Sequence, residues 1–189
     1  PTQFAYENLI GSKNYNSSEI LALNDHQCLV LERDGKGLGD GSKAVVKQVW
    51  AVDLSGAEDV SALSGQASLL AKAPSKTLFL DIAAALKNFG IVDTQIPAKL
   101  EGMAFGQDIV ENGAIKHTLY IANDNDFVPG VAGDNRFFVF SFTDDDLMAK
   151  GLGSLQLQQI AAIPEPETYA LMLAGLGLLG FIARRRNKS

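Results

Sequence analysis

Cysteine and histidine are scarce in this 189-residue chain, and their scarcity excludes several kinds of site. Cys28 is the single cysteine, so no disulfide can form within the chain. Its place in the apolar run 28–31 indicates a small buried side chain. The two histidines, His26 and His117, are far apart and lack the cysteine–histidine spacing of a zinc site. No Gly-x-Ser-x-Gly motif is present, so a hydrolase with the usual nucleophilic serine elbow cannot be placed here.

Basic residues are scarce outside the extreme C-terminus. The whole chain has a formal net charge of −6, but four of its 16 basic residues lie within residues 184–188. Without these four and the two glutamates just before the apolar tail, 12 basic and 20 acidic residues remain. A surface this acidic repels the phosphates of nucleic acid, so we expect no nucleic-acid partner. With 47% hydrophobic and 20% charged residues, the chain can bury a core and is not a disordered polypeptide.

The C-terminal tail combines a Pro-Glu-Pro motif, an apolar run and a basic cluster. The apolar run 169–183 would form a helix about 22 Å long. This is shorter than the hydrocarbon core of about 30 Å, although snorkelling arginines extend its reach. A buried C-terminal helix is the alternative, but the run lacks the polar face that such a helix needs. We therefore predict a single transmembrane helix over 169–183. Arg184, Arg185 and Arg186 would stop transfer and leave the C-terminus in the cytoplasm.

This tail resembles the PEP-CTERM sorting signal. The resemblance implies that an exosortase, a membrane cysteine transpeptidase, recognises Pro164, Glu165 and Pro166 and cuts near them. It further implies export in a Gram-negative-type bacterium, often one that makes exopolysaccharide. The precursor would be anchored in the inner membrane, and the processed protein would reach the cell surface or the medium.

The rest of the chain reads as short strands separated by polar, glycine-rich turns, which predicts an all-β fold. The strand-like runs are 19–23, 28–31, 45–54, 76–80, 100–105, 118–122 and 137–142. One helix is expected over 82–89, with Asp81 as its N-cap and Gly90 just beyond its end. We therefore expect a globular body over 1–143, a linker over 144–163 and the sorting tail over 164–189.

Two stretches of the body look like copies of one three-strand unit. The first has strands at 19–23, 29–34 and 49–54, and the second at 101–105, 119–124 and 138–142. Such meanders are typical of β-propeller blades. Two or three blades cannot close a ring, so we expect a partial, β-propeller-like set of C-terminal blades from a longer protein. Removal of a signal peptide ahead of Pro1 is the alternative.

The repeat predicts one rim that gathers charged residues. In an antiparallel meander, the end of the second strand lies at the same edge as the start of the first. The residues brought together would be Glu32, Arg33, Asp34, Glu101, Asp124, Asn125 and Asp126. Their oxygens could hold Ca²⁺, which takes six to eight oxygen ligands, or could position an acid or base for hydrolysis. The alternative is structural, with ion pairs between blades and Asx-turns at 124–126.

Four segments of the body together resemble the phytase-like, esterase-like domain family. They are Leu-Val-Leu-Glu-Arg-Asp at 29–34, Val-Trp-Ala-Val-Asp-Leu at 49–54, Leu-Glu-Gly-Met-Ala-Phe at 100–105 and Asn-Asp-Asn-Asp-Phe at 123–127. Asn123 stands where the family usually has serine, and the resemblance covers residues 3–142, the C-terminal half of the family's domain. It implies a propeller related to calcium-dependent phytases and a phosphoester or ester hydrolase. Carried over by position, the candidate catalytic residues are Glu32, Arg33, Asp34 and Glu101, and the candidate Ca²⁺ ligands are Asp124, Asn125 and Asp126.

Three functions follow from these observations. The first is a secreted hydrolase in which Ca²⁺ assists the attack of water on a phosphate or carboxylic ester. The second is a non-catalytic surface or matrix protein that binds exopolysaccharide or another envelope component. The third is a purely structural exported protein.

Overall fold

The structure is a computed structural model that describes residues 2–157, 171–176 and 184. The chain divides into two compact units, Pro1–Gln158 and Gln159–Ser189. Residues 171–176 of the second unit are helical. The motif residues 164–166, together with Arg185 and Arg186, lie outside the described residues, as does most of the predicted span 169–183. Within the described parts of the chain, no helix is long and apolar enough to cross a membrane.

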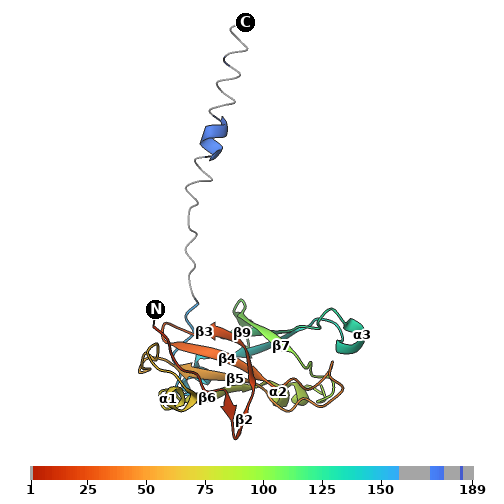
Figure 1. Cartoon of the computed structure of the whole chain (residues 1–189). Coiled ribbons are helices and arrows are strands. Elements are labelled where there is room, and N and C mark those ends of the chain that lie inside the picture. The colour runs from red at the N-terminus through yellow and green to blue at the C-terminus, as the bar shows by residue number, and fades with distance from the viewer. Residues whose placement is uncertain (1, 158–170, 177–183, 185–189) are drawn as a thin grey trace. The chain divides into compact units, whose positions relative to one another are not determined.

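The first sheet is an antiparallel meander of four strands in the order β3-β4-β5-β6 (Figure 1). Its strands are β3 (Asn16–Ala22), β4 (Gln27–Arg33), β5 (Lys47–Asp53) and β6 (Lys76–Asp81). Strand β4 is buried along its whole length, because both of its faces are covered. Leu29 and Leu31 project into the main core, whereas Cys28 and Val30 project from the opposite face.

The second sheet has the order β10-β9-β7, with β8 also paired to β9. Its strands are β7 (Leu100–Phe105), β8 (Ile109–Glu111), β9 (Ala114–Asn123) and β10 (Phe137–Phe142). Strands β7, β9 and β10 are neighbours in the second sheet in that order, as β3, β4 and β5 are in the first. In both sheets a register shift lies between the first two strands, at Ser17/Glu19 and at Leu100/Gly102. Both predicted three-strand meanders are thus present, the first extended by β6 and the second by β8.

The core lies between these two sheets. Leu29, Leu31 and Val49 of the first sheet belong to one buried cluster with Leu119 and Ile121 of the second. In the same cluster the rings of Phe79 and Phe142 meet edge to face, with centroids 5.3 Å apart. The mostly β fold is confirmed. The propeller arrangement stays a prediction, because the described residues supply two large sheets and a two-stranded one, β1 (Leu9–Ile10) with β2 (Lys13–Asn14).

Within residues 2–157, three short helices connect strands and a fourth follows the last strand. Helix α2 (Ile82–Asn88) begins as predicted, since the Asp81 side chain accepts a hydrogen bond from the backbone N–H of Ala84 at 2.9 Å. The others are α1 (Gln66–Leu70), α3 (Pro129–Ala132) and α4 (Asp144–Met148). Leu147 of α4 and Leu152 after it are buried in the main core. The compact unit therefore continues into the segment expected to be a linker.

Candidate functional site

The predicted rim forms where the ends of β4 and β9 meet the start of β7. Arg33 is the last residue of β4, and its Nη2 contacts Glu101 Oε1 on β7. The Arg33 Nε also donates to the Leu100 carbonyl at 3.2 Å. The Arg33 side chain is 10% exposed and that of Glu101 is 34% exposed. This ion pair joins the two sheets and leaves one side of the Glu101 carboxylate open to solvent.

Asp34 is held just behind this pair by a buried lysine that sequence inspection missed. Lys47 begins β5, and its side chain is fully buried. Its Nζ lies 2.9 Å from Asp34 Oδ1 and donates to the carbonyls of Asp34 and Ala98 at 2.8 and 2.7 Å. Burial lowers the pKa of Lys47, and the bond to Asp34 only partly opposes this. Asp34 is therefore occupied as a partner of Lys47.

The pKa of Asp34 is also lowered, and for an acid this means that the charged form is favoured. Burial alone would raise it, but hydrogen bonds from Lys47 and from the N–H groups of Val45 and Val46 stabilise the charged form. The result is a pKa below the ordinary value. Asp34 is consequently a fixed anion at neutral pH, and a poor base.

A glycine-rich loop holds the segment before β7 in place. This segment carries the Ala98 carbonyl that accepts a hydrogen bond from Lys47. The Leu38 N–H donates to the Ile96 carbonyl at 2.8 Å, and the Ala98 N–H donates to the Leu38 carbonyl at 2.9 Å. Gly37 has φ 126°, and a Cβ there would lie 2.2 Å from the Ile96 carbonyl oxygen. Only glycine can lie this close to the Ile96 carbonyl, so the loop packs tightly against the segment before β7.

Lys99 brings the end of β9 into the rim. Its Nζ lies 2.6 Å from Asp126 Oδ1, and the Asp124 N–H donates to the Lys99 carbonyl at 3.0 Å. The pair with Asp126 raises the pKa of Lys99, and the nearby charges of Glu101 and Asp124 add to the rise. The rim therefore sets two cations, Arg33 and Lys99, among the carboxylates of Glu101, Asp124 and Asp126.

The segment after β9 forms the Asx-turns of the structural alternative. Asp124 Oδ1 accepts from the Asp126 N–H at 2.8 Å, and Asn125 Oδ1 accepts from the Phe127 N–H at 3.1 Å. The Asn125 Nδ2 donates to the Gly133 carbonyl at 2.9 Å. Asp126 and Phe127 both have positive φ angles, 52° and 59°, which is uncommon for residues other than glycine.

This arrangement does not fit the predicted Ca²⁺ site. Ca²⁺ needs several oxygens converging on one point. Here Asp126 faces Lys99, while Asp124 and Asn125 accept hydrogen bonds from the backbone. Among the residues that the structure describes, no group of three or more histidine, cysteine or acidic side chains could hold a metal ion. Whether Ca²⁺ binds at the rim is therefore a question for a chelator experiment.

Glu32 does not join the rim, contrary to the expectation for the end of β4. Neighbouring residues of a strand project to opposite faces, so Glu32 points away from the side that Arg33 occupies. Its buried carboxylate accepts from the Tyr6 hydroxyl and lies 2.5 Å from Lys76 Nζ. Lys76 also lies over the Trp50 ring, 4.8 Å from its centroid. Burial, with the bond to Glu32, raises the pKa of Tyr6, which stays a protonated donor.

Two family models match the chain. A model described as phytase-like, esterase-like activity of phytase, matches residues 1–127, which include every rim residue named above. A model of the PEP-CTERM protein-sorting motif matches residues 162–186. No curated protein and no solved structure matches the chain.

Proposed function

We propose, from the premise that this chain belongs to the phytase-like family, that its rim binds anionic esters and hydrolyses them outside the cytoplasm. The PEP-CTERM motif implies processing by an exosortase and export through a membrane-anchored precursor. The family's description names an esterase-like activity.

The observation that carries the proposal is the ion pair of Glu101 with Arg33 at a rim that also holds the pair of Lys99 with Asp126. The Glu101 side chain is one-third exposed and contacts Arg33, and its charge contributes to the raised pKa of Lys99. Guanidinium and ammonium groups hold phosphate or carboxylate oxygens through charge-assisted hydrogen bonds. A carboxylate beside a bound ester can take a proton from an attacking water.

The reaction that this geometry supports is a direct hydrolysis. Water attacks the phosphorus or carbonyl carbon while its proton passes to Glu101. Arg33 and Lys99 stabilise the negative charge that develops on the ester oxygens. The bond to the alcohol breaks, and the alcohol takes its proton from solvent. Of the other candidate catalytic residues, Asp34 is committed to Lys47 and Glu32 is buried on the opposite face.

Non-catalytic binding of an anionic envelope polysaccharide is the second candidate. It is favoured by the pairing of carboxylates along the rim, since Glu101, Asp34 and Asp126 each have a cationic partner. Ion pairs of this kind stabilise a binding surface without taking part in a reaction. This candidate predicts retained polysaccharide binding and no turnover.

The full chain should hydrolyse p-nitrophenyl phosphate, an anionic ester that the two cations can hold. Lys99→Met should raise KM by about tenfold, because one charge-assisted contact is lost. Lys116→Met is the matched control, since Lys116 forms an exposed pair with Glu111 away from the rim. Absence of turnover, with binding of an acidic polysaccharide retained, would favour the second candidate.

The same assay tests Ca²⁺. The paired carboxylates of the rim predict turnover that persists in EDTA. Activity that disappears in EDTA and returns with added Ca²⁺ would show that the rim rearranges into a cation site.

Export can be tested at the sorting motif. In cells with an active exosortase, replacing Glu165 and Pro166 by alanine should leave the precursor uncut in the inner membrane, with its C-terminus cytoplasmic. Glu167→Ala, one residue beyond the Pro-Glu-Pro motif, is the control. Fractionation and the apparent mass of the body report the outcome. Normal release of the double variant would contradict the role assigned to the motif.

A further inference from the structure

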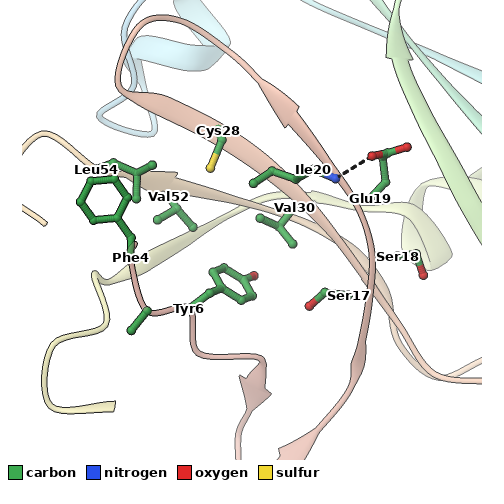
Figure 2. Close-up of a pocket in the computed structure, with 11 residues that line it drawn as sticks. Phe4, Tyr6, Ser17, Ser18, Glu19, Ile20, Cys28, Val30, Val52 and Leu54 are labelled. Atoms are coloured by element: carbon green, nitrogen blue, oxygen red, sulfur yellow. Dashed lines mark hydrogen bonds between the residues drawn. The ribbon is translucent and has the colours of Figure 1, made fainter. Parts of the chain in front are cut away.

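The outer face of the first sheet carries a cavity of about 500 Å³ that is unrelated to the rim (Figure 2). One wall is the N-terminal segment with Phe4 and Tyr6, and the opposite wall is β3 with Ser17 and Ile20. Cys28, Val30 and Val52 contribute side chains from β4 and β5. The volume is that of a typical small-molecule site.

The N-terminal segment covers this face only in part. Tyr6 packs against the cluster of Cys28, Val30 and Val52 and is fixed by its hydrogen bond to Glu32. Beyond Tyr6 the apolar walls stay open to water, with Phe4 42% and Ile20 63% exposed. Apolar surface gathered in a concave site favours a ligand that removes it from water.

The charge of the lining limits the chemistry of that ligand. None of the described residues that line the cavity is a lysine or arginine, and Glu19 is its single acidic residue. Glu19 Oε1 accepts a hydrogen bond from the Ile20 N–H at 2.9 Å. Burial raises the pKa of Tyr6 and of Cys28, so both are uncharged at neutral pH. A phosphate or carboxylate finds no cationic partner in this lining, in contrast to the rim.

The shape of the cavity favours a slender occupant. Val52, Val30 and Cys28 are only 1, 4 and 8% exposed, so a flat protein surface cannot reach them. Tyr6 and Ile20 line this cavity from the two opposite walls. We infer that this cavity binds the uncharged acyl chain of an amphipathic molecule, independently of any hydrolysis at the rim.

Cys28 provides a specific reporter, because it is the single cysteine and contributes to the cavity lining. With the full chain, the neutral probe N-phenyl-1-naphthylamine should show saturable fluorescence. Bound probe should slow the reaction of Cys28 with a disulfide reagent. Methyl octanoate should displace the probe, whereas octanoate should compete at least about tenfold less well, because the lining offers its carboxylate no cationic partner. Displacement by phosphatidylcholine vesicles would identify a lipid as the source of the chain.

Ile20→Trp should fill the mouth and weaken probe binding by at least about tenfold. Val45→Trp is the matched control, since Val45 is equally exposed at 63% but does not line the cavity. Ser17→Phe, from the same wall, is a second filling variant, and thermal melts check that each variant folds. Unsaturable binding, or binding unchanged in both filling variants, would overturn the inference. A dimer in sedimentation that only the filling variants disrupt would also overturn it, because a second copy would then cover this face.

Discussion

Replacing Lys47 by methionine is expected to lower the free energy of unfolding by about 3–5 kcal/mol. The Lys47 side chain is fully buried, and its Nζ satisfies Asp34 and the carbonyl of Ala98. Methionine keeps most of the length and apolar character of the side chain, so the loss arises from a buried carboxylate without its cation. Urea unfolding at pH 7 measures the change.

Two controls isolate the electrostatic part of this loss. Lys72→Met removes an exposed pair with Glu58 and should cost less than about 1 kcal/mol. The double variant Lys47→Met with Asp34→Asn removes both charges and should recover a large part of the stability. A Lys47→Met variant as stable as Lys72→Met would show that Lys47 does not stabilise the base of the rim.

The same pair makes stability depend on acid pH. The pKa of Asp34 is lower in the folded chain than its ordinary value near 3.8. Its contribution is therefore fully present above that value and is lost as the pH falls through the folded pKa. We expect the stability of the unmodified chain to fall below about pH 4, and to fall less steeply in Asp34→Asn.

The strands could be predicted because their apolar residues follow strand periodicity between clear turn signals. The run 137–142 became β10 with unchanged bounds, and the Asp81 cap placed the start of α2. The two-stranded β1–β2 sheet could not be predicted in this way, because strands of two residues have no periodicity to detect.

The sequence predicted where the rim would lie, but not which contacts its residues would make. Meander geometry correctly brought Arg33 and Glu101 together across two sheets. It could not show that Glu32 faces the other side with Tyr6 and Lys76, because alternation sets the relative but not the absolute face of a strand.

The two lysines of this region, Lys47 and Lys99, had no clear signal in the sequence. Lysine in a strand usually indicates the solvent face, yet Lys47 is fully buried. Its pairing depends on Ala98, which comes near only through the loop clamped at Gly37. Lys99 adjoins Leu100 at the start of β7, and this neighbourhood is the one hint that it belongs to the rim.

Changing Glu101 to glutamine should reduce kcat by about 10²–10⁴-fold. Glutamine keeps the shape of the side chain and can accept a hydrogen bond from Arg33, but it cannot take a proton from water. Because the Glu101 side chain is 34% exposed, the amide can be hydrated, and the melting temperature should change little. Glu111→Gln is the matched control, since Glu111 pairs with Lys116 on the β8–β9 hairpin and does not touch the rim.

The decisive measurement is kcat for Glu101→Gln and Glu111→Gln side by side, with p-nitrophenyl phosphate, at a temperature where both variants are fully folded. If the rim is an active site, kcat should fall in Glu101→Gln but not in Glu111→Gln, and the melting curves of both variants should be unchanged. Equal kcat in the two variants, or a loss of kcat that occurs only where the variant unfolds, would contradict this. The pair of Arg33 and Glu101 would then only stabilise the contact between the two sheets.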